Sequence, residues 1–219
     1  MQKINHQEIE RLLSDLFLQN EIETIHEIYA QYRRLFVESE TAQNRDQATD
    51  ELRKFISPFE RRIGGIGYDE LLYGKDGSKY SGNYPVADRA IYRPLQYALA
   101  NLLLAGNPRN SIRESCAHLE GILKRRYDRR IENILRKPLG SITHSARKMN
   151  LFSDELLIKL QLITEMNNIA KHDYGPETAT IEEQDELRWN LDSKVFSDFE
   201  GLAMYFICRK VGIELMKAS

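Results

Sequence analysis

The stretch "NNIAKHDYG", residues 167–175, holds the side chains best suited to chemistry in this chain. Asn168 and His172 are four positions apart, so on a helix they share one face, and the amide could orient the imidazole for proton transfer. Lys171 stands beside them as a source of positive charge. A structural interpretation is also open, in which a helix ends here: Lys171 and His172 complement its exposed carbonyls, and Asn168, His172 and Tyr174 hold the helix end in place.

A second pair of candidate residues lies in "RESCAH", where four residues separate Arg113 from His118. The histidine could move protons and the arginine could stabilise negative charge on a phosphate. If the helices that carry these two stretches pack side by side, Arg113 could join His172. The alternative is that Arg113 and His118 are polar residues beside an apolar seam, which is formed by Ile112, Cys116, Leu119 and Leu123.

The formal net charge of -2 conceals two blocks of opposite sign. Residues 109–148 contain eleven Lys or Arg against four acids, and residues 173–200 contain nine acids against two bases. The first block could attract RNA or another polyanion, or the two blocks could neutralise each other between packed helices. The predicted RNA-binding residues, with an aromatic ring able to stack on a base, are Lys124, Arg125, Arg126, Tyr127, Arg129 and Arg130. A solvated helix end is the alternative.

The sequence gives no sign of a metal or cofactor. The two cysteines, Cys116 and Cys208, lack a CxxC or Cys/His ligand spacing, and His6, His26 and His144 stand alone. Residues 65–86 are rich in Gly and Tyr but lack the GxxxxGK[ST] pattern, so we predict an irregular connecting loop with no phosphate site. No apolar run has the roughly 20 residues that a membrane-spanning helix needs, and no secretory signal opens the chain, which favours a cytoplasmic protein.

Apolar residues recur with a helical period through most of the chain, which predicts an all-α helical bundle. We divide it into an N-terminal helical region (1–64), the connecting loop (65–86) and a C-terminal bundle (87–219). Pro58 is expected to bend or restart a helix over about 46–63, and Ser153 to cap the helix that follows it. The predicted core stripes include Ile9, Leu12, Leu13, Leu16, Ile25, Ile28, Tyr29, Tyr32, Leu35, Phe36, Leu52, Phe55, Ile56, Phe59, Ile63, Phe196, Phe199, Leu202, Ala203, Phe206 and Ile207.

Three segments in order, "RESCAHLEGILKRRY", "PLGSITHSARKMNLFSDELL" and "EMNNIAKHDYG", resemble the HEPN superfamily, in particular its HEPN-like branch. The resemblance covers roughly residues 87–215 and leaves the first 85 unexplained. Active HEPN ribonucleases carry an Arg, usually followed by Asn, with four to six residues before a His. The His and Asn of this pattern fall on His172 and Asn168, but Asn167 occupies the Arg position.

The resemblance implies one of two functions. In the active members the ribose 2'-hydroxyl attacks the adjacent phosphate, the His moves protons and the Arg stabilises the phosphorane without a metal. Many members that lack the full motif are instead interaction modules, such as the regulatory half of a toxin-antitoxin or antiviral defence pair. Because Asn167 carries no charge, we expect a non-catalytic module, and we expect a homodimer formed by the broad apolar stripes of 153–170 and 196–215. An unrelated structural helical protein remains the third possibility.

Overall fold

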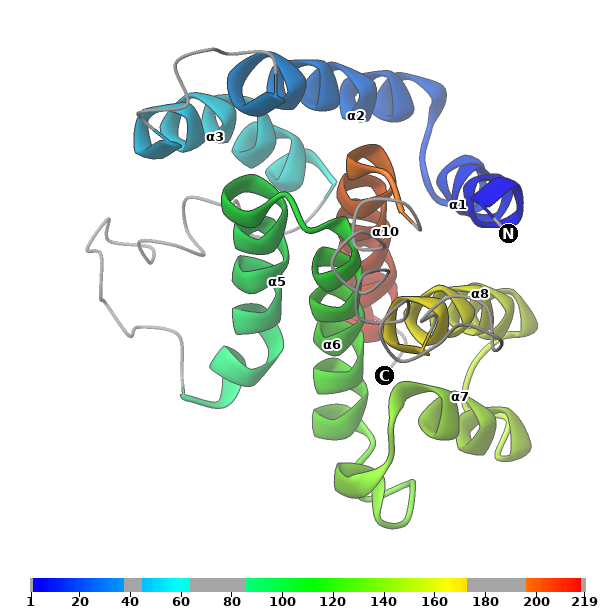
Figure 1. Ribbon diagram of the computed structural model, residues 1–219. Helices are drawn as coiled ribbons and strands as arrows, with labels where there is room; N and C mark the ends of the chain where they lie inside the picture. The colour runs from blue at the N-terminus through cyan, green and yellow to red at the C-terminus, as the bar shows by residue number, and fades with distance from the viewer. Residues whose placement is uncertain (1, 38–44, 64–85, 173–195, 218–219) are drawn as a thin grey trace, which may run out of the picture.

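The computed structural model describes residues 2–37, 45–63, 86–172 and 196–217, and they form eight α-helices without a strand among them (Figure 1). The helices are α1 (Gln2–Leu16), α2 (Gln19–Tyr32), α3 (Arg45–Arg62), α5 (Val86–Ala105), α6 (Pro108–Arg126), α7 (Leu139–Lys148), α8 (Asp154–His172) and α10 (Asp198–Lys217). A π-helical turn, Arg33–Val37, extends α2, and a 3-10 turn, Ile134–Arg136, precedes α7. The predicted all-α bundle is confirmed.

Short side chains and glycine set the ends of several helices. The Asn107 side chain accepts a hydrogen bond from the backbone N–H of Asn110 (2.9 Å) just before Pro108 opens α6, which is the position where a proline costs no hydrogen bond. Gly106 takes a left-handed conformation (φ +57°) that lets α5 turn into α6 within two residues. Ser153 caps α8 as expected, since its Oγ accepts from the N–H of Leu156 (3.3 Å). These local signals place α6 beside α5 and fix where α8 starts.

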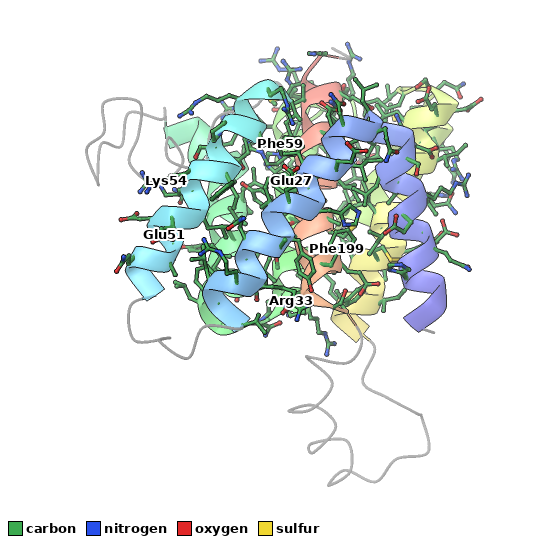
Figure 2. The ribbon with its side chains drawn as sticks, turned by 90° about the horizontal axis from the view of Figure 1, so that it is seen from above. Glu27, Arg33, Glu51, Lys54, Phe59 and Phe199 are labelled. Atoms are coloured by element: carbon green, nitrogen blue, oxygen red, sulfur yellow. The ribbon has the colours of Figure 1, made fainter. Side chains whose placement is uncertain are left out.

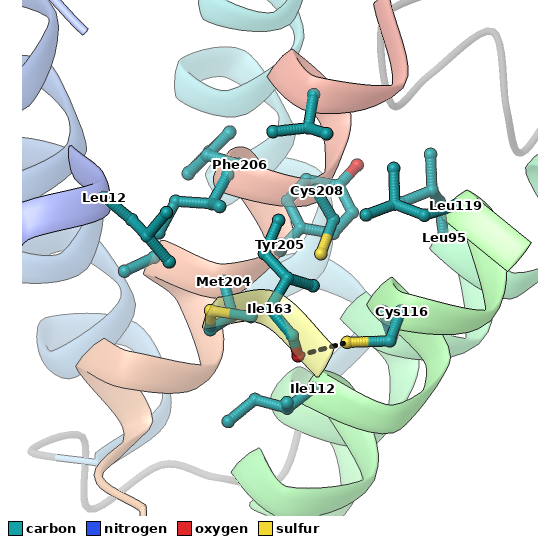
Figure 3. Close-up of a cluster of buried hydrophobic side chains, with 14 of the residues drawn as sticks. Leu12, Leu95, Ile112, Cys116, Leu119, Ile163, Met204, Tyr205, Phe206 and Cys208 are labelled. Atoms are coloured by element: carbon teal, nitrogen blue, oxygen red, sulfur yellow. Dashed lines mark hydrogen bonds between the residues drawn. The ribbon is translucent and has the colours of Figure 1, made fainter. Parts of the chain in front are cut away.

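Helix α10 is buried on every side. All residues from Phe199 to Arg209 are buried, and α10 packs against α1, α2, α5, α6 and α8 (Figure 1). Of the predicted core side chains, Phe206 and Ile207 lie in α10 and Phe196 lies just before it, but the other side of the helix is covered as well. Figure 3 shows Tyr205, Phe206 and Cys208 of α10 among apolar side chains of α1, α5, α6 and α8. Of the two apolar stripes that we expected to form a dimer, the one on 196–215 therefore packs within one chain.

The N-terminal helices share this core. Phe59 of α3 meets Phe206 of α10 edge to face (5.0 Å between ring centroids), and Leu12 of α1 is fully buried against the same cluster. Figure 2 shows Phe59 and Phe199 among the helices, whereas Glu51 and Lys54 of α3 lie on its outer side. The predicted boundary between residues 1–64 and 87–219 thus does not separate two cores. The predicted loop at 65–86 falls outside the described residues except for its last position, where α5 begins.

Pro58 lies inside a continuous α3, so it does not restart the helix. Phe55 is 42% exposed, because it falls on the outer side of α3 away from the buried Leu52, Ile56 and Phe59. The π-helical turn also leaves Leu35 and Phe36 only partly buried.

A carboxylate and a guanidinium lie together in the core. Glu60 of α3 is fully buried, and its Oε1 lies 3.4 Å from Nε of Arg209, which is 3% exposed. The same Oε1 accepts a hydrogen bond from the hydroxyl of Tyr205, and the guanidinium of Arg209 lies over the Tyr205 ring (5.7 Å to the centroid). Removing one charge from such a pair leaves the other buried without its counter-charge, which is costly.

We therefore expect Glu60→Gln to lower the free energy of unfolding by about 3 kcal/mol, although the side chain keeps its size. Glu51→Gln is the matched control, because Glu51 lies on the exposed side of the same helix and its ion pair with Arg34 (3.9 Å) contributes less than about 1 kcal/mol. Urea denaturation followed by circular dichroism measures both. Equal, small effects of the two substitutions would contradict this role of the buried pair.

Candidate functional site

The end of α8 carries the stretch that the sequence singled out, and its asparagines face different surroundings. Asn167 is 3% exposed, and its Oδ1 accepts no hydrogen bond from the described residues. Asn168 is exposed and Lys171 is half-buried. His172 is the last residue of α8, and its side chain, like Tyr174, lies outside the described residues. A charged residue at the position of Asn167 would point into the protein, not toward a bound phosphate.

The last turn of α8 is held by an arginine that was not among the predicted site residues. Nε of Arg109, in the first turn of α6, donates to the carbonyl of Ala170 (2.5 Å), and Arg109 is 6% exposed. The cation thus satisfies one of the carbonyls that a helix leaves open at its C-terminus. A basic residue in the first turn of a helix interacts unfavourably with the helix dipole, but the sequence does not indicate which helix end Arg109 contacts.

Arg113 and His118 do not form one site. Arg113 is exposed and its Nη1 donates to Oδ1 of Asn110 (3.2 Å). His118 is 2% exposed and points toward α5 and α10, where its Nδ1 lies 2.7 Å from the carbonyl oxygen of Ile91 and Nε2 lies against Gly212. The burial of His118 is incompatible with its predicted catalytic role. The alternative prediction, a polar residue beside an apolar seam, fits its position.

Burial lowers the pKa of His118 from 6.5 to about 4. The hydrogen bond to Ile91 acts in the opposite direction, and the positive charge of Arg209 adds to the lowering. At neutral pH the ring is uncharged, with its Nδ1–H donated to the carbonyl. It stabilises the contact between α5 and α6 and exchanges no proton with a substrate.

The predicted RNA-binding residues lie at the C-terminal end of α6 and in the turn that follows it. Arg125, Arg129 and Arg130 are exposed, and the turn adds exposed Arg136. Some of the predicted cations are held within the chain: Nζ of Lys124 pairs with Glu120 (2.6 Å), and Nη1 of Arg126 donates to the carbonyl of Met216. Among the described residues, no acid forms an ion pair with Arg129, Arg130 or Arg136. This end of the molecule therefore presents a basic surface.

Tyr127 does not belong to that surface. It is 2% exposed and packs edge to face on Phe152 (5.1 Å between centroids), with the guanidinium of Arg130 near its ring. Its ring has no open face, so the prediction that Tyr127 stacks on an RNA base is wrong. The apolar spacing explains the burial, because Tyr127 continues the buried side of α6 formed by Leu119 and Leu123.

The cysteines are structural, and two of the histidines, His6 and His26, contact α10. Cys116 and Cys208 are buried, and Figure 3 shows the contact of Cys116 Sγ with the carbonyl of Ile163 (3.9 Å). Burial, together with the neighbouring Cys116, raises the pKa of the Cys208 thiol well above its usual range, which excludes a reactive thiolate. His6 lies near Glu200 (3.8 Å), and His26 stacks on Phe199 (4.7 Å).

The described part of the chain contains no group of three His, Cys, Asp or Glu side chains arranged to hold a metal ion. Nor does any helix within it combine the length and apolar character needed to cross a membrane.

A small cavity of about 170 Å³ lies between α7 and α8. Its lining comes from one face of each helix: Gly140, Thr143, His144 and Arg147 from α7, and Gln161 and Thr164 from α8. The helices leave this space because the residues in the middle are small, and a Cβ on Gly140 would already lie 3.0 Å from Cγ2 of Thr164. Of the lining residues, only His144 has a reactive side chain that the sequence analysis considered. The sequence feature that could have indicated a cavity is the pair of small residues Gly140 and Thr143.

No family model matches this chain, and neither the curated proteins nor the solved structures include a significant match to it.

The lowered pKa of His118 predicts a pH-dependent stability. The unfolded chain takes up the proton at about pH 6.5 while the folded chain resists it until about pH 4, so the unfolded state binds more protons in this window and stability falls as the pH is lowered through it. The loss is on the order of 3 kcal/mol. We expect His118→Asn, whose amide can donate to the Ile91 carbonyl in place of Nδ1–H, to show a smaller loss over the same range.

Urea midpoints of wild type and His118→Asn, measured at neutral pH and near pH 4.5, give the loss of stability of each protein between the two pH values. A general weakening by the substitution is the same at both pH values and cancels in this difference. If wild type and His118→Asn lose stability in parallel, His118 is not the group responsible.

Proposed function

We propose that this protein is a non-catalytic helical interaction module that binds RNA through the basic surface at the end of α6. The observation that carries the proposal is the set of exposed guanidinium groups of Arg129, Arg130 and Arg136, which have no ion-pair partner among the described residues. A phosphate backbone offers the closely spaced negative charges that such a set attracts, and arginine suits phosphate because its planar fork donates two hydrogen bonds at once.

The absence of catalysis in this proposal rests on three placements. His118 is buried and uncharged, Asn167 is buried, and Arg113 is exposed on another side of α6. A phosphoryl-type transition state gains on the order of 10² to 10³ in rate from one well-placed stabilising donor. None of these residues is in a position to supply that stabilisation together with proton transfer.

The HEPN resemblance supports the further proposal that the module acts with a partner in a toxin-antitoxin or antiviral defence pair. A homodimer also remains a proposal. Its interface would have to use surfaces other than α10, for example the outer face of α8, where Ile158 is 46% exposed.

Removing two of the exposed arginines tests the RNA surface. We expect Arg129→Gln with Arg136→Gln to weaken binding of single-stranded RNA and to reduce the slope of log affinity against log salt by roughly 0.7 for each phosphate that is no longer neutralised. The control Arg11→Gln with Lys54→Gln removes the same charge from exposed positions on α1 and α3 and leaves the slope unchanged. Fluorescence anisotropy with a labelled oligoribonucleotide gives both quantities. Equal losses of affinity in the two double variants would show that RNA binding depends only on net charge, and would refute a defined RNA-binding surface.

A cleavage assay tests the non-catalytic part of the proposal. We expect wild type and His172→Ala to leave a mixed RNA pool intact in the presence of a chelator, because no arginine stands at position 167. Metal-independent cleavage by wild type that disappears in His172→Ala would establish the ribonuclease alternative.

A further inference from the structure

The cavity between α7 and α8 has a distinct arrangement of hydrogen-bonding groups. Its floor carries the hydroxyls of Thr143 and Thr164, which are 6% and 9% exposed. Each hydroxyl donates its proton to a carbonyl of its own helix: Thr143 to Leu139 (3.0 Å) and Thr164 to Leu160 (2.7 Å). What remains for a ligand at the floor is therefore oxygen lone pairs and methyl groups.

The rim of the cavity carries donors and two flat side chains. Arg147 is held beside Gln161, since its Nη2 donates to Oε1 of Gln161 (2.9 Å), and Gln161 in turn donates to Glu165 (3.0 Å). His144 is exposed beside it, one helical turn before Arg147. Guanidinium and imidazole planes are surfaces on which unpaired RNA bases stack.

These features select a neutral, flat group over an anion. A phosphate in the cavity would face the lone pairs of both threonines, which repel it. A nucleobase has N–H donors for the floor, acceptors for Arg147, and a flat face for stacking. The volume of about 170 Å³ is below the roughly 300–1,000 Å³ of sites for drug-sized ligands, so it suits one such ring system rather than a whole nucleotide.

We infer that this cavity is a base-binding pocket, which receives one unpaired nucleobase of the RNA strand held by the basic surface. The inference rests on the proposed function and specifies how the module engages its RNA. The chain supports the connection, because α7 begins three residues after Arg136 and lies beside the end of α6 (Figure 1). The backbone N–H of Leu139, the first residue of α7, also donates to Glu120 of α6 (3.0 Å), which fixes the pocket relative to the basic surface.

The test compares two labelled single-stranded RNAs of equal length and charge, one with ordinary mixed bases and one with abasic ribose at every position. Fluorescence anisotropy at one fixed salt concentration gives the affinity of the full-length protein for each. We expect wild type to bind the base-bearing strand about tenfold more tightly than the abasic strand, the usual effect of one stacked base. Arg147→Ala and, separately, the isosteric Thr164→Val should remove most of that ratio.

Lys148→Ala is the matched control, because Lys148 is an exposed cation on the same helix outside the cavity lining. It should weaken both strands by the same factor and leave their ratio unchanged. Equal affinity of wild type for the two strands, or equal ratios in Arg147→Ala and Lys148→Ala, overturns the base pocket while RNA binding itself stands. Failure of both strands to bind wild type overturns the proposed function and the pocket together.

Discussion

The ion pair between Glu60 and Arg209 constrains the whole arrangement of helices. Two opposite charges are costly in a protein interior unless they lie close to each other. Here the carboxylate comes from α3 and the guanidinium from α10, with Tyr205 one helical turn before Arg209. The pair can form only if α3 closes over α10, which commits the N-terminal helices to the same core as the C-terminal ones.

The central position of α10 follows from the same constraint. A helix surrounded on every side must be apolar, and any polar group on it needs a partner within the protein. Apolar residues fill most of α10. At its start, the Ser197 Oγ and the Glu200 carboxylate accept hydrogen bonds from each other's backbone N–H groups. Small residues then allow close packing: a Cβ on Gly201 would lie 2.9 Å from Cβ of Pro108, and a Cβ on Gly212 would lie 2.7 Å from Nε2 of His118. The path of α6 along α10 depends on these two glycines.

This core holds several residues with reactive side chains. His118 and both cysteines are held inside as uncharged packing groups, and Arg109 is used to close the end of α8. At the surface, the basic end of α6 and the face where α7 meets α8 carry polar and charged side chains.

The helical class, the cap at Ser153 and nearly all of the core stripes could be predicted from the sequence alone, because helical periodicity and capping depend on residues three or four positions apart. The basic segment around Arg129 could be located in the same way. Which side chains meet depends on the packing of the helices: Arg109 and not Arg113 reaches α8, Tyr127 and His118 face inward, and residues before position 64 share a core with those after position 86. The physical reason is that such contacts join residues from about 25 to 150 positions apart, such as His118 with Ile91 and Glu60 with Tyr205, and no local pattern encodes which helix faces meet. The cavity between α7 and α8 has the same origin, since it exists only where the small residues of two helices come to face one another.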